Sequence, residues 1–183
     1  MVDETPPAVI DLEGIRLRRP RLSDAEAIFE YGSDIEVARF ADWPVRTSVE
    51  SVIESIQERA ALWDAGVEFS WVIATADEDV AIGGVFCKIS EDGAEVGFLV
   101  DRRYWGRGYA TQAAGAVLSW VYSNSSISRV WATCDVENVA SIRVLEKHGF
   151  VRERRLDRAI VRPQISDLPR DAYLYSCRSP SGP

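Results

Sequence analysis

The stretch Arg103-Tyr-Trp-Gly-Arg-Gly-Tyr-Ala-Thr111 follows a strand-like segment, Glu95–Val100, and leads into a run with helical spacing that extends to Asn124. A strand that passes through a glycine-rich turn into a helix presents free backbone N–H groups at the positive end of the helix dipole. Gly106 and Gly108 let an anion approach that backbone closely. The stretch therefore predicts a site for phosphate oxygens. A tight strand–helix turn with exposed arginines would have the same sequence pattern.

The charge of this loop differs from that of the whole chain. The 183 residues carry 21 Lys and Arg against 29 Asp and Glu, a net charge of −8. Arg102, Arg103 and Arg107 nevertheless gather in one loop, which favours an anionic ligand at that point over general affinity for polyanions. We therefore expect no nucleic-acid partner. Cys87, Cys134 and Cys177 lack metal-ligand spacing and are interpreted as buried, reduced thiols, so no metal site is expected.

The apolar patterning predicts one α+β domain over residues 14–177, with a flexible leader (1–13) and a flexible tail (178–183). No apolar run approaches the ~20 residues that cross a bilayer, and the acidic N-terminus lacks a signal peptide's features. A cytoplasmic protein without membrane contact is expected. The pattern Ser23-Asp-Ala-Glu26 predicts a capping box that starts a helix. Expected strands are 15–18, 69–74, 81–88, 94–100, 129–134, 150–156 and 172–177, and expected helices include 109–124 and 138–148.

Two familiar phosphate motifs do not fit this loop. A Walker loop ends in Gly-Lys-Ser/Thr, whereas Tyr109 follows Gly108 here, and the dinucleotide fingerprint needs a glycine or alanine where Thr111 stands. What remains is Arg-x-x-Gly-x-Gly at 103–108 followed by Ala110, together with the later segments Asn138-Val-Ala-Ser141 and Leu145-Glu-Lys-His-Gly-Phe150. Over residues 12–177 this combination resembles the GNAT superfamily of N-acetyltransferases, and its RimJ/RimL-like branch in particular.

The resemblance implies a mixed, mostly antiparallel sheet whose parallel strand pair splays apart around the donor substrate, acetyl-coenzyme A. It implies transfer of the acetyl group to a primary amine, either a protein N-terminus or a small molecule, by direct attack in a ternary complex. Backbone N–H groups of the loop would receive the pyrophosphate, and the main chain at 98–100 would pair with the pantetheine arm. The implied cofactor-binding residues are Phe98, Leu99, Val100, Arg103, Gly106, Arg107, Gly108, Tyr109, Ala110, Thr111 and Asn138.

The expected roles of individual side chains leave alternatives open. Phe98 and Val100 would also suit core packing, and Asn138 would also suit a helix N-cap. Family members often place a tyrosine acid at the position of Leu145, which cannot donate a proton, so we assign stabilisation of the leaving thiolate to Ser141.

On the acceptor side, Glu95 is the candidate general base, although an ordinary exposed strand glutamate fits equally. Phe40 and Trp43 resemble the family's acceptor-side wall. Residues 157–171 are expected as a long loop opposite that wall, and a loop of such length suggests function. His148, in the last turn of a helix, is interpreted as a packing residue.

Two further functions remain alternatives at this stage: a noncatalytic domain that binds or senses acyl-coenzyme A, and a nucleotide-binding regulator. The acidic chain would suit a cationic acceptor amine, but net charge does not define a pocket. The acceptor, the acyl chain length and a homodimeric state are not specified by the sequence.

Overall fold

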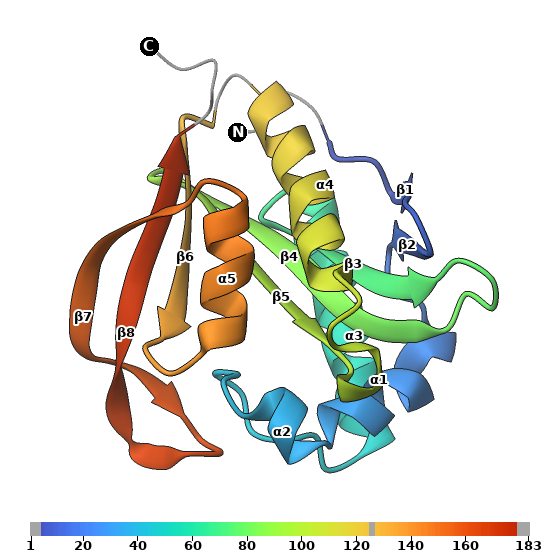
Figure 1. Cartoon of the computed structure of the whole chain (residues 1–183). Helices are drawn as coiled ribbons and strands as arrows, with labels where there is room; N and C mark the ends of the chain where they lie inside the picture. Colours follow the sequence, from blue (N-terminus) through green and yellow to red (C-terminus); the bar gives the residue numbers. More distant parts are fainter. Residues whose placement is uncertain (1–4, 125–126, 179–183) are drawn as a thin grey trace.

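Eight strands of the described chain, residues 5–124 and 127–178, form one sheet in the order β1-β2-β3-β4-β5-β6-β8-β7 (Figure 1). The structure is a computed structural model. Its strands are β1 (Val9–Asp11), β2 (Ile15–Arg18), β3 (Glu68–Thr75), β4 (Ala81–Ser90), β5 (Gly93–Val100), β6 (Arg129–Asp135), β7 (Val151–Arg162) and β8 (Ser166–Arg178). Its helices are α1 (Ala25–Gly32), α2 (Ile35–Ala38), α3 (Val49–Asp64), α4 (Tyr109–Ser123) and α5 (Val139–Lys147), with short 3-10 turns at Leu22–Asp24 and Arg102–Tyr104. The expected α+β class with a mixed, mostly antiparallel sheet is confirmed.

The parallel pair of the sheet is short and opens toward its carboxyl ends. Strands β5 and β6 run parallel, and their paired positions are Ala94 with Val130 and Glu95 with Trp131. Strand β5 stays paired with β4 as far as Val100, so β6 is the strand that departs. The remaining neighbouring strands of the described sheet pair antiparallel. The expected splay is therefore present, and it leaves one edge of β5 open beyond Glu95.

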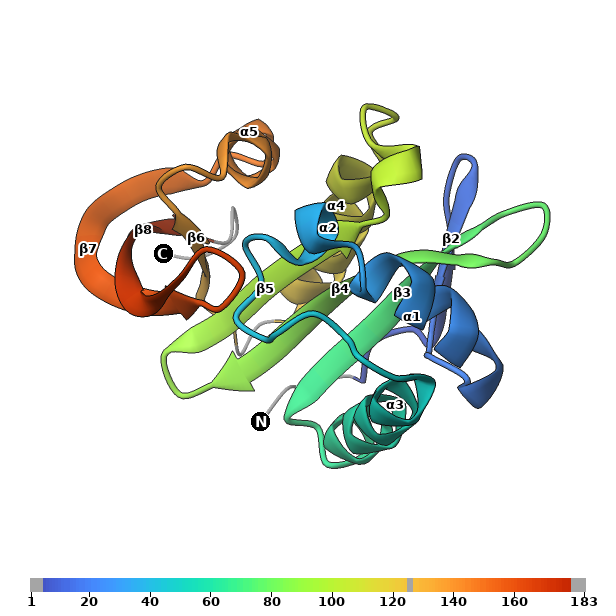
Figure 2. The ribbon, with the colours of Figure 1, turned by 90° about the horizontal axis from the view of Figure 1, so that it is seen from below.

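The core lies mainly between the sheet and α4. Phe69 of β3 meets Trp120 of α4 with ring centroids 5.2 Å apart and planes at 79°. Such edge-to-face pairs add about 0.5–1.5 kcal/mol beyond the area they bury. Helix α1 packs Ala27 and Ile28 against Val72 on the other face of the sheet, and α3 packs on α1. Figure 2 shows α4 on one side of the sheet and α1 and α3 on the other.

The first helix begins one residue later than a cap at Ser23 predicts, inside the Ser23–Glu26 pattern. Helix α1 starts at Ala25, and the residue with the capping role is Asp24, whose carboxylate accepts the Arg21 N–H at 2.7 Å. The same carboxylate binds the buried Arg18 guanidinium through two hydrogen bonds of 2.8 Å. The contact of Asp24 with Arg18 of β2 therefore helps to set where this helix begins. The local sequence pattern does not contain this contact.

The segment predicted as a flexible leader is partly ordered. Residues Val9–Asp11 pair with β2 as an edge strand, and the Pro7 carbonyl accepts the Trp71 indole N–H at 2.9 Å. A three-residue strand is too short for its alternation to stand out in the sequence, so the leader's boundary at residue 13 was wrong. Residues 1–4 lie outside the described chain, as do residues 179–183 of the predicted tail. Arg178, the first residue of that tail, still belongs to β8.

The long loop predicted over residues 157–171 is instead the outer part of the β7–β8 hairpin. Strand β7 continues to Arg162 and β8 begins at Ser166, so the turn holds residues 163–165 alone. Register shifts accompany a positive φ of 49° at Arg158 and bend the hairpin. Pro163 lies in the turn, where a proline costs no ladder hydrogen bond.

Candidate active site

The loop between β5 and α4 has the backbone conformation expected of an anion site. Gly106 and Gly108 adopt positive φ angles of 78° and 80°, a region that residues with a Cβ rarely enter. In the described chain, the backbone N–H groups of residues 106–111 donate to no protein acceptor, because the first turn of a helix has no preceding carbonyls. A Cβ at either glycine would meet nothing within 4 Å. Backbone conformation, not packing, therefore requires glycine at both positions.

Arg103, expected to contact the pyrophosphate, is held by protein carboxylates. Its Nε and Nη2 donate to Asp101 at 2.9 and 2.6 Å, and its Nη1 donates to Glu30 at 2.9 Å. The bond to Asp101 and then the bond to Glu30 raise the pKa of Arg103 above its ordinary value. The first role of this arginine is therefore to fix the loop against α1, which holds Glu30.

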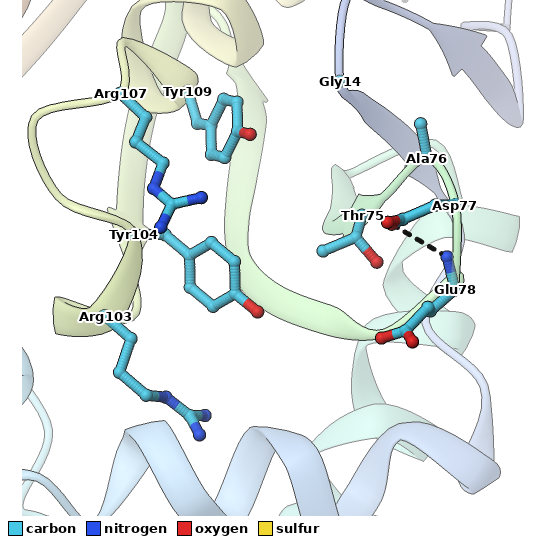
Figure 3. A pocket seen from close by; sticks show the side chains of 9 residues that line it. All are labelled: Gly14, Thr75, Ala76, Asp77, Glu78, Arg103, Tyr104, Arg107 and Tyr109. Atoms are coloured by element: carbon cyan, nitrogen blue, oxygen red, sulfur yellow. Dashed lines mark hydrogen bonds between the residues drawn. The ribbon is translucent and has the colours of Figure 1, made fainter.

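Arg107, unlike Arg103, is not held by carboxylates of the described chain. Its guanidinium lies 5.1 Å over the ring of Tyr104, and it makes no ion pair with the described residues. A cavity of about 570 Å³ opens here, on the side of the loop that faces the β1–β2 and β3–β4 turns (Figure 3). Its other lining residues are Gly14, Thr75, Ala76, Asp77, Glu78, Arg103 and Tyr109. Because β1–β4 and β6 lie on opposite sides of β5, this cavity is separate from the splay.

The carboxyl half of β5 forms one wall of the splay. The Phe98 side chain packs against the main core and Val100 is buried in it, so their expected packing role is present. The Val100 carbonyl also accepts the Trp105 indole N–H at 2.7 Å. The main chain at Phe98 and Leu99 lies on the edge of β5 with which β6 no longer pairs. A backbone edge of this kind can pair with an extended ligand as a strand would.

Helix α5 begins at the other wall of the splay. The Asn138 side-chain oxygen accepts the Ser141 backbone N–H at 3.2 Å, which makes Asn138 the N-cap. Ser141 is half-buried in the first turn, and its hydroxyl donates to none of the described residues. Leu145, one turn later, is buried in the core. The position that often holds a tyrosine acid therefore serves packing here.

His148 connects α5 to the loop helix. Its Nε2 lies 2.8 Å from the Thr111 carbonyl, so this nitrogen carries the proton and donates. The ring also lies over Gly115, where a Cβ would come within 2.9 Å of Cε1. This agrees with the packing interpretation and adds a tether that the sequence did not indicate. Cys134, on β6, is likewise enclosed, and burial raises the pKa of its thiol to about 11.

Glu95 lies at the point where the parallel pair separates. It pairs with Lys88 across β4 and with Trp131 across β6. Alternation turns its side chain to the face of the sheet opposite α4, since its neighbours Ala94 and Val96 are buried in the α4 core. Burial raises the pKa of Glu95, with smaller effects in the same direction from Asp42 and Glu68, against Lys88. A half-buried carboxylate with a raised pKa is well suited to accept a proton near neutral pH.

The segment after α2 and the β7–β8 turn are joined at the same end of the splay, as Figure 2 shows. The Gln164 side-chain amide donates to the Ala38 carbonyl at 2.6 Å and to the Trp43 carbonyl at 2.8 Å. Phe40 and Trp43 are both half-buried, and Arg46 lies 5.0 Å over the Trp43 ring. Gln164 therefore joins the segment that carries Phe40 and Trp43 to the hairpin turn, and the role of these two residues as an acceptor-side wall stays a prediction.

Two side chains with unusual surroundings were missed by sequence reasoning. Arg162 is buried at the end of β7, and its Nε has no hydrogen-bond partner. Trp131, beside Glu95, likewise has an enclosed indole N–H without a partner. Their neighbours come from distant parts of the chain, so no local pattern could have identified them.

The fold and the loop define the class of protein. Residues 15–151 match the family described as Acetyltransferase (GNAT) domain. The chain is also 30% identical over 175 residues to the uncharacterized N-acetyltransferase YoaA of Bacillus subtilis, covering 94% of this chain and 97% of that protein. The chain therefore belongs to the GNAT acetyltransferase family. It is an N-acetyltransferase, and acetyl-coenzyme A is its acetyl donor.

Solved structures agree with this assignment at the level of the fold. The crystal structure of a GNAT-family acetyltransferase from Bacillus anthracis superimposes with a TM-score of 0.81 at 26% identity, covering 93% of this chain and 98% of that one. RimL, a ribosomal L7/L12 alpha-N-protein acetyltransferase in complex with coenzyme A, gives a TM-score of 0.82 at 21% identity, covering 93% and 97%. The expected RimL-like fold is confirmed. None of the described helices is long and apolar enough to cross a membrane.

Proposed function

We propose that this acetyltransferase delivers its acetyl group to a primary amine, a protein N-terminus or a small molecule, which attacks directly within a ternary complex. When bound, acetyl-coenzyme A supplies the acetyl thioester. The observation that carries the proposal is the pair of left-handed glycines before α4, with the unpartnered backbone N–H groups of residues 106–111 beside the splay. These groups would receive the pyrophosphate, because a helix N-terminus with free amides favours anions.

Further residues would hold the donor along the splay. The Arg107 guanidinium, which lies over the Tyr104 ring beside the separate cavity, would turn toward the pyrophosphate and add charge there. Arg103 would act through its hydrogen bonds to Asp101 and Glu30. The open edge of Phe98 and Leu99 would pair with the extended arm. A backbone N–H at one of these two residues would polarise the carbonyl oxygen as negative charge develops there. Asn138 would act by fixing the first turn of α5, in keeping with its N-cap bond.

The proton transfers are assigned to Glu95 and Ser141. Glu95 would remove a proton from the acceptor nitrogen, directly or through one water, so that the neutral nitrogen forms the new C–N bond. The nitrogen then gives its second proton to water as the C–S bond breaks. The Ser141 hydroxyl would donate a hydrogen bond to the departing thiolate, which takes up a proton from water in turn. Phe40 and Trp43 would form the wall that positions the acceptor.

Two kinds of acceptor are proposed, and a relative supports one of them. RimL is an alpha-N-protein acetyltransferase by its description, which supports a protein N-terminus as one acceptor for this chain. A small-molecule amine is the other, and the acidic net charge would favour a cationic one over long distances. We also propose a cytoplasmic protein, in keeping with its bacterial relatives, and a homodimeric state, which size measurements in solution would test.

Thiol release from acetyl-coenzyme A tests the proposal directly. An amine panel should include N-terminal peptides, polyamines, aminoglycosides and amino acids. We expect at least one class to release free thiol in proportion to acetylated amine. Binding of acetyl-coenzyme A without release for any amine would instead favour the noncatalytic sensor. Competition by ATP but not by coenzyme A would favour a nucleotide-binding regulator.

A further inference from the structure

Arg162 is a buried cation for which the described chain supplies no partner. The residue is 7% exposed at the end of β7. Its Nε is fully enclosed without a hydrogen bond, and no hydrogen bond or ion pair joins its side chain to another described residue. An enclosed guanidinium is costly when its N–H groups lose water and gain no acceptor.

The other buried arginine of the described chain, Arg18, is paired with carboxylates, and so is the half-buried Arg170. Arg18, 1% exposed, donates to both Asp24 and Asp79. Arg170, on the partner strand of the same hairpin, donates to Asp135 at 2.7 and 3.2 Å and pairs with Glu137 at 2.9 Å. The fold therefore provides carboxylates for these two guanidinium groups. Arg162 is an exception that folding by itself does not explain.

The position of Arg162 is fixed against the acceptor wall. Its carbonyl accepts the Ile165 N–H at 2.8 Å, which closes the hairpin turn. Two residues after Arg162, Gln164 binds the carbonyls of Ala38 and Trp43. The turn that holds Arg162 is thus joined to the segment that carries Trp43.

Two carboxylates lie close enough to act on Arg162 without binding it. Burial lowers the pKa of Arg162, while Asp42 and Asp135 act in the opposite direction. Asp135 already holds Arg170 in two hydrogen bonds, and Asp42 is exposed to solvent. Asp42 also raises the pKa of Glu95, so Asp42 is within electrostatic range of both Glu95 and Arg162. The geometry agrees, because Gln164 binds the carbonyls of Ala38 and Trp43 on either side of Asp42, which places the turn that holds Arg162 against this segment.

We propose that Arg162 binds an anionic group carried by the acceptor, so that the preferred substrate is an amine bearing a carboxylate or a phosphate. This inference rests on the proposed function, because it places the acceptor between Glu95 and the hairpin turn. A guanidinium offers a fork of N–H donors that matches the two oxygens of such a group. The enclosed indole N–H of Trp131, beside Glu95, provides a second donor without a partner at this face. The substrate anion would accept hydrogen bonds from the Arg162 guanidinium, for which the described chain provides no acceptor. This direct contact would affect the choice of acceptor amine more than the long-range effect of net charge.

Matched acceptor pairs test this inference. The pairs are glycine with glycinamide, Ala-Glu-Ala amide with Ala-Gln-Ala amide, and phosphoethanolamine with ethanolamine, which separate a main-chain carboxylate, a side-chain carboxylate and a phosphate. We expect the anionic member of at least one pair to have the higher kcat/KM. Arg162→Met should lower that value by about 10- to 100-fold, as for loss of a charged hydrogen bond. The neutral member and the KM for acetyl-coenzyme A should stay nearly unchanged.

Arg154→Met is the control, because it removes the same charge from an exposed position on the same strand. It should leave the preference between paired acceptors intact. Preference for the neutral members, or an equal loss for both members in Arg162→Met, would overturn the inference.

A second measurement needs no turnover. If Arg162 awaits a ligand, Arg162→Met should unfold at a temperature about 2–4 °C higher than the wild type, since an unpartnered buried charge is removed. N-acetylglycine, a product-like carboxylate, should raise the unfolding temperature of the wild-type complex with coenzyme A. N-acetylglycinamide should not, and neither compound should affect Arg162→Met. A lower unfolding temperature for Arg162→Met would assign the arginine a structural role. Absence of turnover with every amine would reject the proposed function, and these shifts would still decide the role of Arg162.

Discussion

We propose that two regions of the site, the loop of residues 106–111 (the donor wall) and the segment near Trp43 with the β7–β8 turn (the acceptor wall), recognise their ligands in different ways. At the donor wall, residues 106–111 present main-chain N–H groups, and the required conformation depends on two glycines with positive φ. At the acceptor wall, the segment near Trp43 and the β7–β8 turn present side chains, and these two segments are held together by Gln164. Main-chain recognition leaves a local pattern of glycines in the sequence, whereas side-chain recognition across distant segments leaves none. The donor could therefore be identified from the sequence and the acceptor could not.

This contrast predicts that substitutions at one wall affect one substrate. The largest effect is expected at Gly108, which has φ of 80°. Gly108→Val should weaken binding of coenzyme A by at least about 100-fold, because a β-branched residue in this conformation distorts the turn and its N–H groups. Calorimetric titration measures the loss. Gly66→Val is the matched control, since Gly66 has φ of 69° and open space around it but lies in a turn after α3. Equal loss of affinity in the control would show that general strain, and not the loop, is responsible.

Glu95→Gln tests the junction between the two walls. We expect kcat to fall by about 10²- to 10⁴-fold, the range for loss of a general base, with binding of coenzyme A retained. In the wild type, activity should be lost as the pH falls through the pKa of Glu95, which burial raises, so this acidic limb should lie at a higher pH than for an ordinary glutamate. The limb should be absent from Glu95→Gln. An unchanged pH–rate profile in the variant would remove Glu95 from the base role. Glu91→Gln, in the exposed turn before β5, is the control.

Ser141→Ala should give a smaller loss. The Asn138 cap uses the Ser141 backbone N–H, so α5 keeps its start when the hydroxyl is removed. A hydrogen bond from the neutral hydroxyl to the charged thiolate corresponds to about 10- to 100-fold in kcat. Ser119→Ala removes a hydroxyl that donates to the Gly115 carbonyl on the exposed side of α4 and should leave kcat unchanged. Undiminished turnover of Ser141→Ala would eliminate the proposed role.

His148→Ala should affect the donor wall alone. It removes the bond to the Thr111 carbonyl that ties α5 to the first turn of α4. Loss of one such bond should weaken coenzyme A binding by about 3- to 10-fold, with the KM for the amine unchanged. His148→Gln keeps a donor and should restore part of the affinity. A change confined to the amine KM would contradict the division between the two walls.

Gln164→Ala is the counterpart at the acceptor wall. It releases the hairpin turn from the carbonyls of Ala38 and Trp43, and the amine KM should rise by about 3-fold or less, as for loosened positioning. Coenzyme A affinity should not change. Gln164→Glu, which replaces the amide donor with an acceptor, should behave like the alanine variant. Steady-state kinetics with each substrate varied separately distinguishes this result from general destabilisation.

The sequence predicted the parts of the fold that local patterns encode. The three central strands and α4 follow from alternation and helical spacing, and the loop between β5 and α4 follows from its glycines. Residues 157–171, the outer part of the β7–β8 hairpin, were expected as a loop, because the register shifts that bend the hairpin leave no regular alternation there. The start of α1 was displaced because Asp24 responds to Arg18, a tertiary contact. Arg162 was also missed because of tertiary structure. Only the folded chain shows that its buried Nε has no hydrogen-bond partner among the described residues.

Hydrogen exchange at the loop tests the central claim most directly. Backbone amides of residues 106–111 should exchange freely in the protein by itself and become strongly protected when acetyl-coenzyme A is added at saturating concentration. The turn after α3 at Gly66 should show no change. Saturable binding of acetyl-coenzyme A that leaves the amides of residues 106–111 unprotected would contradict the claim that main-chain N–H groups hold the donor.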